Sequence, residues 1–159
     1  MSIQKALIGS SLCFLVFSII APVNIKAAYN GSETWLHYSP VSDATLKAQY
    51  QSVCGSLVLS DPQSDTLKNA QAEFDLAIPK LLDGSKLSNT DGPGAIILAA
   101  EGSSLLPGGI DFSKINDEGF IIKSDGGKTF ITGKNQIGVL RGVFHFIRLM
   151  QTQKPLTDL

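Results

Sequence analysis

A basic cluster in one predicted helix is the first place where residue types and spacing could support chemistry. Arg141, His145 and Arg148 recur at four- and three-residue spacing, which puts them on one face of a helix. Such a group could contact an anion such as a sugar acid. The same spacing is typical of a solvated basic face at the rim of a domain, and we favour that interpretation.

Acidic residues in a glycine-rich stretch are the second candidate. A glycosidase needs two carboxylates placed across the scissile bond, and Asp111, Asp117 and Glu118 all precede a predicted strand. Carboxylates in loops are mostly solvated, so we expect surface charges here. The sequence has no G-x-S-x-G elbow to hold a nucleophilic serine. We therefore predict no catalytic residue in this chain.

Phosphate, dinucleotide and metal sites also fail on spacing. The run GGKT at 126–129 resembles the end of a phosphate-binding loop, but Ile122 stands where that loop needs a glycine, and the threonine enters a strand. The run GPG at 92–94 lacks a third glycine and precedes a strand. The two histidines, His37 and His145, have no second ligand at metal spacing. We predict no cofactor and no metal.

Length and charge indicate one domain with no special affinity for polyanions. The chain has 159 residues and a net charge of −1, so neither nucleic acid nor a charged membrane surface is an expected partner. Of the two cysteines, Cys13 lies in the N-terminal apolar segment. Cys54 is left without a disulfide partner, and we expect it to be a buried small hydrophobe.

The N-terminus has the layout of a signal peptide. Lys5 precedes an apolar run over 6–21, and Ile25 and Ala27 occupy the −3 and −1 positions of a cleavage site. The alternative is an uncleaved anchor, but the run of 16 residues is shorter than the roughly 20 needed to span a bilayer. We predict a signal peptide over 1–27, a mature domain over 28–159, secretion or a periplasmic location, and no membrane association after cleavage.

Periodicity predicts an alternation of strands and helices. We expect a strand at 34–38, a helix from Ser42 or Asp43 to about 52, strands at 55–60 and 95–100, a hairpin turning at 125–127, and a helix at 136–151. The strand at 95–100 is expected to be central. Trp35, the only tryptophan, could stack on a sugar, but packing beneath a helix is the interpretation that we favour.

The strongest local pattern is a helix that Ser64 or Asp65 is expected to cap at its N-terminus. Its apolar residues recur at three- and four-residue spacing, and Gly84 is expected at the left-handed C′ position. Pro79 should kink or shorten its last turn. Together with the hairpin, these elements predict an α+β fold, a small mixed β-sheet with helices packed on one face.

Two glycines distinguish the last helix. Gly138 and Gly142 lie one turn apart within a wide apolar stripe. Glycine costs a helix up to about 1 kcal/mol relative to alanine, and its usual compensation is close approach of the backbone to a neighbouring element. We therefore predict that this helix serves packing and not catalysis.

The region 117–153 resembles the end of the N-terminal domain of microbial α-glucuronidases, with a related pattern in domains that precede some β-hexosaminidase barrels. That pattern is E-G-[FY]-x-I, then I-x-G, then G-x-L-[YR]-G-x-F-x-x-[IL]-R-x-x-Q. It is met by Glu118, Gly119, Phe120, Ile122, Ile131, Gly133, Gly138, Leu140, Gly142, Phe144, Ile147, Arg148 and Gln151. Arg141 stands where the family often has tyrosine. ETWLHYSPVSD at 33–43 resembles the opening of that domain, and AIILA at 95–99 its central strand.

The resemblance implies a non-catalytic accessory domain of a secreted α-glucuronidase. In that family a following (β/α)8 barrel of about 250 residues removes 4-O-methylglucuronic acid from xylo-oligosaccharides in xylan breakdown. We expect this chain to stop before that barrel, its partner in cis, and to be inactive alone. Two alternatives stay open: a free-standing secreted carbohydrate-binding or interaction module, and the accessory domain of a β-hexosaminidase-like enzyme.

Overall fold

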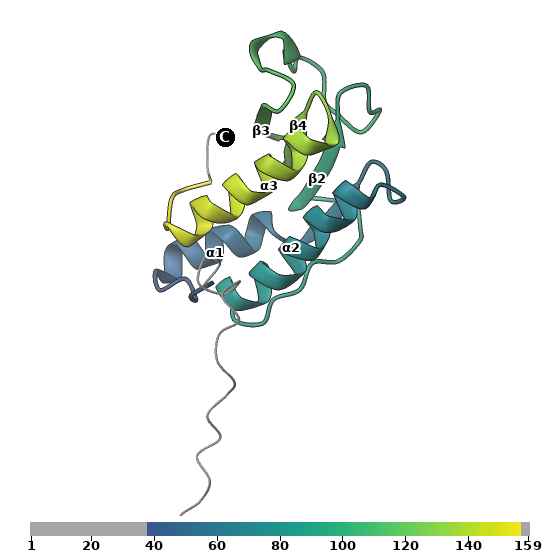
Figure 1. Cartoon of the computed structure of the whole chain (residues 1–159). Helices are drawn as coiled ribbons and strands as arrows, with labels where there is room; N and C mark the ends of the chain where they lie inside the picture. Colours follow the sequence, from purple (N-terminus) through teal and green to yellow (C-terminus); the bar gives the residue numbers. More distant parts are fainter. Residues whose placement is uncertain (1–37, 157–159) are drawn as a thin grey trace, which may run out of the picture. The chain divides into compact units, whose positions relative to one another are not determined.

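The computed structural model describes residues 38–156, which form four strands and three α-helices (Figure 1). The signal peptide expected at 1–27 and the strand expected at 34–38 lie outside these residues except for Tyr38, which is in no strand. In chain order the elements are α1 (Ala44–Val53), β1 (Ser56–Leu59), α2 (Asp65–Leu81), β2 (Ala95–Ala100), a short 3₁₀ helix (Phe112–Lys114), β3 (Phe120–Asp125), β4 (Lys128–Gly133) and α3 (Gln136–Gln151).

The strands form one mixed sheet in the order β1-β2-β4-β3. β1, β2 and β4 are parallel, while β3 is antiparallel to β4, with Phe120 opposite Gly133 and Asp125 opposite Lys128. The hairpin turn uses Gly126 and Gly127, both with positive φ (57° and 76°), as a tight two-residue turn requires. The expected central position of 95–100 is confirmed, because β2 lies between two parallel neighbours.

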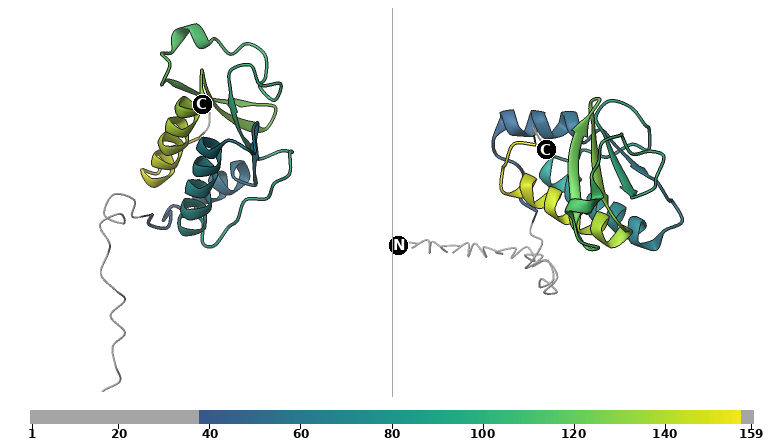
Figure 2. Two further views of the ribbon diagram at one scale, coloured as in Figure 1. Left: turned by 45° about the vertical axis from the view of Figure 1, so that its right-hand side comes forward. Right: turned by 90° about the horizontal axis from the view of Figure 1, so that it is seen from above.

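The three helices pack on one face of this sheet, which confirms the predicted α+β class (Figures 1 and 2). Alternation along the strands sends Ile96, Leu98 and Ile131 toward the helices. The opposite face carries a smaller cluster of Ala95, Ile97, Ala99 and Phe130, and Leu106 from the loop after β2 packs against it. One face thus carries the helical core and the other is covered in part by loop.

Helix α3 approaches the hairpin so closely that its contact residues must be glycine. A Cβ placed on Gly138 would lie 2.3 Å from the Gly119 carbonyl oxygen, and one on Gly133 would lie 2.8 Å from the same oxygen. The carbonyl of Gly119 therefore sits between the backbones of β4 and α3. Such distances leave room only for a Cα hydrogen, as in weak Cα–H···O contacts.

Gly142 repeats the arrangement one turn later. A Cβ on Gly142 would lie 2.6 Å from Ile131 Cγ2 and 3.2 Å from Phe120 Cβ. The side chains of β3 and β4 fill the space that the missing Cβ leaves. The scaffold interpretation of the two helical glycines is therefore confirmed.

Helix α2 departs from expectation at its C-terminal end. Pro79 removes one backbone donor, yet the helix continues to Leu81, because the Leu82 N–H still donates to the Ile78 carbonyl at 2.9 Å. The expected shortening is wrong. Leu82 is the C-cap, so the left-handed C′ position belongs to Asp83 (φ 51°) and not to Gly84. Gly84 is the next residue, and its N–H donates to the Pro79 carbonyl at 2.7 Å, which completes a Schellman motif.

The segment after α3 is tied back to α1. Helix α1 is capped by the Asp43 carboxylate, which accepts from the Thr45 and Leu46 N–H groups. The Tyr50 hydroxyl donates to the Lys154 carbonyl at 2.6 Å, and Leu156 is only 3% exposed. The described part of the chain thus ends packed against its own first helix.

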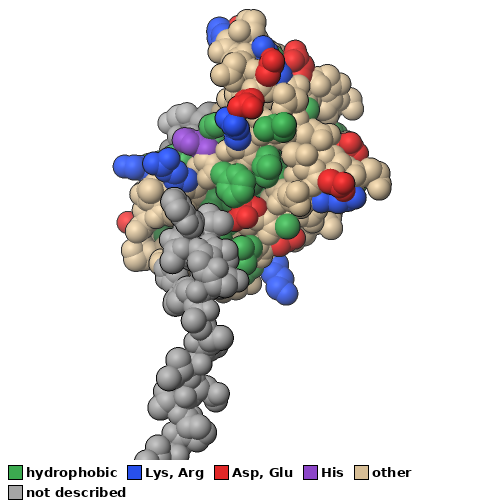
Figure 3. Space-filling model, in the orientation of Figure 1, with side chains coloured by type: hydrophobic (Ala, Val, Ile, Leu, Met, Phe, Trp, Pro, Cys, Tyr) green, Lys and Arg blue, Asp and Glu red, His purple; other side chains and the backbone are tan. Residues whose placement is uncertain are grey.

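Some large apolar side chains stay in solvent. Leu76 on α2, Leu105 in the loop after β2, and Ile137 and Phe144 on α3 are between 39% and 51% exposed. Figure 3 shows hydrophobic side chains gathered over the part of the surface where α3 lies. This exposed strip is bordered by charged side chains.

Replacing Gly138 with alanine is expected to destabilise the domain by about 1–3 kcal/mol, the usual range for overpacking. Alanine favours a helix by up to about 1 kcal/mol over glycine, but the clash prevails because the opposing atom is a backbone oxygen that cannot rotate away. Denaturant unfolding measures the change. Gly108→Ala is the control, since a Cβ there meets nothing within 4 Å and should stay within about 0.5 kcal/mol. Equal stability of both variants would contradict the close contact.

Candidate functional site

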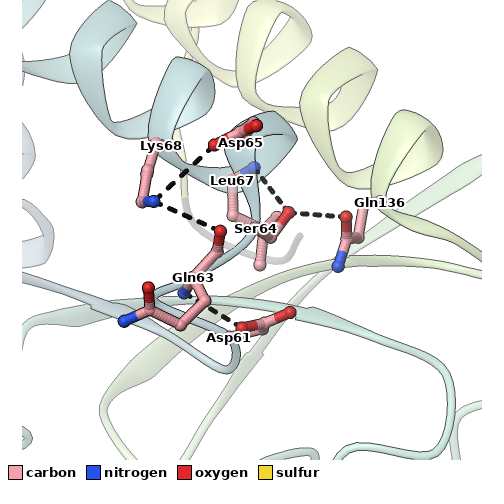
Figure 4. Close-up of polar contacts among 7 residues, drawn as sticks. All are labelled: Asp61, Gln63, Ser64, Asp65, Leu67, Lys68 and Gln136. Carbon is pink, nitrogen blue, oxygen red and sulfur yellow. Dashed lines mark hydrogen bonds and ion pairs between the residues drawn. The ribbon is translucent and has the colours of Figure 1, made fainter.

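The carboxyl edge of the parallel strands is where ligands commonly bind in open α/β sheets, and here it is the place where α2 and α3 begin. An open hollow of about 600 Å³ lies there, lined by Thr66, Ala100, Asn135, Gln136 and Ile137. Figure 4 shows the polar contacts at the start of α2 beside α3. This hollow is the best-placed candidate site in residues 38–156.

One serine joins the two helix starts. The Ser64 hydroxyl accepts from the Leu67 N–H at 3.2 Å and donates to Gln136 Oε1 at 2.5 Å (Figure 4). Ser64 is thus both the N-cap of α2 and a bridge to the first turn of α3. Sequence predicted the cap, but nothing in the local pattern indicated the bridge, which depends on α3 lying alongside α2.

The N-terminus of α3 is capped in the same manner. Asn135 Oδ1 accepts from the N–H groups of Ile137 and Gly138 at 3.0 and 3.1 Å, and its Nδ2 donates to the Asp117 carbonyl at 2.5 Å. Asp65 adds a negative charge to the first turn of α2. The two caps occupy backbone N–H groups that an anion would need as donors, and the Asp65 carboxylate would repel an anion. The edge is built to hold two helices in register rather than to bind phosphate or carboxylate.

The basic face of α3 is exposed, as expected. Arg141, His145 and Arg148 all lie in solvent. Arg141 pairs with Glu118 at 2.6 Å, and the His145 ring lies 5.2 Å from the Phe120 ring. Arg141 and His145 therefore contact residues at the start of β3. Both contacts join residues within the region 117–153, which carries the family pattern. The sequence did not predict the ion pair, because Glu118 and Arg141 are distant in the chain.

The three loop carboxylates do not form a glycosidase pair. Asp111 caps the 3₁₀ helix, and hydrogen bonds from Ser113 lower the pKa of its carboxyl group. A general acid needs the opposite shift. Asp117 lies 3.8 Å from the Lys134 ammonium, and Glu118 is held by Arg141. Each carboxylate is a surface ion-pair partner.

The glycine runs are structural as well. Lys128, from the GGKT run, begins β4 and pairs with Asp91 at 2.5 Å, so no helix N-terminus follows the run. Gly94, from the GPG run, has φ 79°, and a Cβ there would lie 2.6 Å from the Ser52 carbonyl oxygen. The two runs thus allow a tight turn and a close approach of two backbones.

The remaining candidates carry no reactive arrangement among the residues that the structure describes. Cys54 is buried, and burial raises the pKa of its thiol to about 12, which makes it a weak nucleophile. Within 38–156 no three His, Cys, Asp or Glu side chains gather as metal ligands. In the same range no helix is long and apolar enough to cross a membrane. Trp35 and His37 lie outside the described residues.

Comparison with known proteins identifies the domain class. Residues 34–146 match the family model described as glycosyl hydrolase family 67 N-terminus, and the chain therefore belongs to that family. It is an accessory domain type of glycoside hydrolases. No curated protein sequence matches it. Among solved structures, a GH138 enzyme targeting pectin rhamnogalacturonan II is similar, with a TM-score of 0.46 and 23% identity over 61% of this chain. The match spans 10% of that enzyme's length.

Removal of the Ser64 hydroxyl is expected to destabilise the fold by about 1 kcal/mol or slightly more, because both the α2 cap and the link to Gln136 are lost. Ser64→Thr keeps a hydroxyl for both bonds and should retain most of the stability. Thermal or denaturant unfolding compares Ser64→Ala with this variant and with Ser104→Ala, an exposed serine outside the helices. An unchanged Ser64→Ala protein would show that the bridge contributes nothing.

Proposed function

We propose that this chain is the N-terminal accessory domain of a secreted α-glucuronidase that removes (4-O-methyl)glucuronic acid from xylo-oligosaccharides. The observation that carries the proposal is the family match over 34–146. It is supported by what the motif residues do: Gly119, Gly133, Gly138 and Gly142 allow the hairpin and α3 to touch. In this proposal the domain contributes a folded support, and a (β/α)8 barrel of the intact enzyme supplies catalysis.

The described surface is consistent with a supporting role. Its acidic loop residues are engaged in ion pairs or caps, and the basic side chains of α3 lie along β3 rather than around a cavity with carboxylates. Inversion of a glycosidic linkage needs two carboxyl groups about 6.5–9.5 Å apart with a water between them. We propose that those groups belong to the barrel.

The cellular route belongs to the same proposal. Residues 1–27 have the charge, apolar run and small residues of a signal peptide. We propose that the signal is removed after Ala27 and that the enzyme acts in the periplasm or medium. N-terminal sequencing of the secreted protein tests this point.

We expect the purified 159-residue chain to release no glucuronic acid from aldouronic acids, because the candidate carboxylates Asp111, Asp117 and Glu118 are each held in a cap or an ion pair. The test reads the gene beyond the Leu159 codon, expresses the complete product and assays both proteins on the same substrates. Activity in the complete product alone supports the proposal. Release of acid by the 159-residue chain would contradict the accessory role. Release of N-acetylhexosamine in place of glucuronic acid would contradict the substrate.

A further inference from the structure

A groove follows the flank of α2 that faces the edge strand β1. It consists of two cavities with shared walls, of about 280 and 260 Å³. Asp75 on α2 lines the first cavity, and Gln71, one helical turn earlier, lines the second. The opposite wall carries Leu87 and Asn89, from the segment that runs back along α2 toward β2 (Figures 1 and 2). We call these four residues, together with Lys86, the flank groove.

The floor of the flank groove is apolar and its rim is polar. Phe74 and Ile78 on the floor are buried, and Leu87 beside them is half-buried. Asp75 and Lys86 are exposed at the rim and carry opposite charges. An apolar floor with a few polar side chains around it is the usual composition of a small-molecule site. Because the two charges cancel, the groove favours a neutral ligand over an ion.

The polar side chains of the rim have no role in holding the fold together. Within residues 38–156, no hydrogen bond or ion pair is made by four of them: Gln71, Asp75, Lys86 and Asn89. Other polar side chains of the same helices are engaged, as in the ion pair of Asp65 with Lys68 and the hydrogen bond of Gln136 to Ser64. The donors and acceptors of the rim are therefore available to a ligand.

Pro79 adds a backbone acceptor to the groove. A carbonyl in an α-helix accepts from the N–H four residues later. Residue 79 is a proline within α2, so the Asp75 carbonyl lacks this donor. Asp75 and Pro79 line the same cavity. A helical carbonyl without its donor is satisfied by water or by a ligand, and here the free carbonyl belongs to a residue of the groove wall.

The edge of β1 is already paired where the groove lies, which disfavours a peptide as the ligand. The Leu57 N–H donates to the Ser88 carbonyl at 2.8 Å, and the Ser88 N–H donates to the Gly55 carbonyl at 3.1 Å. An extended peptide that adds to a sheet edge depends on such main-chain bonds. The flank groove offers side-chain donors and acceptors above an apolar floor. This combination matches a sugar ring, which has hydroxyl groups at its edge and C–H groups on its faces.

We propose that the flank groove binds two neighbouring sugar units of an unsubstituted xylan chain. Sugar hydroxyl groups donate to the carboxylate and the carbonyl of Asp75. Others accept from the Lys86 ammonium and from the side-chain amides of Gln71 and Asn89, while a ring face packs on Leu87. Gln71 and Asp75 are about 6 Å apart along the helix, so each cavity takes one ring. The choice of xylan rests on the function proposed above, and the groove holds the polymer away from the site of hydrolysis.

Titration of the isotope-labelled 159-residue chain with xylohexaose tests the position of the site. We expect the amide chemical shifts of residues 71–79 and 86–89 to change and those of α3 to stay constant. Cellohexaose is the comparison ligand, because it has the same linkage and an additional hydroxymethyl group on each ring. We expect it to bind more weakly, since the cavities are small.

Paired substitutions that preserve the net charge test the rim. The double variant Asp75→Asn, Lys86→Gln should bind xylohexaose about tenfold more weakly, because hydrogen bonds to charged groups are the stronger ones. The double variant Asp65→Asn, Lys68→Gln is the matched control. This ion pair lies at the start of the same helix and lines neither cavity, so binding should stay within about twofold of wild type. Circular dichroism checks that both proteins are folded.

Pro79→Ala separates binding from folding. Alanine supplies the N–H that the Asp75 carbonyl lacks and stabilises the helix. We expect this variant to resist denaturant better than wild type and to bind xylohexaose about threefold more weakly. Undiminished binding in the stabilised variant would contradict the role of the carbonyl.

The proposal would be overturned by constant groove shifts at saturating xylohexaose, or by equal binding of the two double variants. Tighter binding of cellohexaose would exclude xylan as the ligand. Groove shifts that change on dilution without sugar would assign the groove to a second copy of the chain. Release of glucuronic acid is measured separately on aldouronic acids with the α-glucuronidase proposed above. Its persistence without groove binding would overturn this inference and leave the proposed function intact.

Discussion

The approach of α3 to the β3–β4 hairpin is the constraint on which the rest of the domain depends. The Gly119 carbonyl lies between two backbones, and any side chain larger than a hydrogen at Gly133 or Gly138 would meet it. This contact sets how deep α3 lies on the sheet. Its depth in turn determines whether Phe146 reaches Phe74 on α2 and whether Gln136 reaches Ser64. One backbone contact thus propagates into the packing of both parallel helices.

The same contact explains why so many motif residues of the family are apolar or glycine. Gly119, Gly133, Gly138 and Gly142 provide space, and Phe120 and Ile131 fill it from the strands. The polar motif residue Glu118 pairs with Arg141, where the family often has tyrosine. An exposed pair of this kind contributes at most about 1 kcal/mol. The pattern therefore encodes a way of packing α3 against the hairpin.

Local physics made most of the fold predictable from sequence. The helix at 136–151, the hairpin turn and the buried strand at 95–100 follow from apolar period, paired glycines and composition. The end of α2 was misjudged by one residue, because aspartate as well as glycine tolerates the left-handed conformation. The helix also continues past Pro79, because the loss of one backbone donor does not prevent the later hydrogen bond from the Leu82 N–H to the Ile78 carbonyl.

What the sequence could not predict were side-chain links between distant elements. Ser64 to Gln136 and Tyr50 to Lys154 join residues whose neighbourhood is decided only by the complete fold. For the candidate sites, the sequence correctly predicted that a strand follows each glycine run. The roles of the three loop carboxylates could be assigned only from the structure, which shows each of them in a cap or beside a cation.

The central claim is that α3 supplies packing rather than chemistry. The most direct measurement is the kcat/KM of the α-glucuronidase proposed above, in which Arg141, His145 and Arg148 of this domain are all replaced by glutamine. These three side chains are exposed, so the variant should fold. The account predicts a kcat/KM on aldouronic acids within about twofold of wild type, because that is less than about 0.5 kcal/mol of transition-state binding. A loss of two orders of magnitude in a folded variant would contradict it and place α3 in the active site.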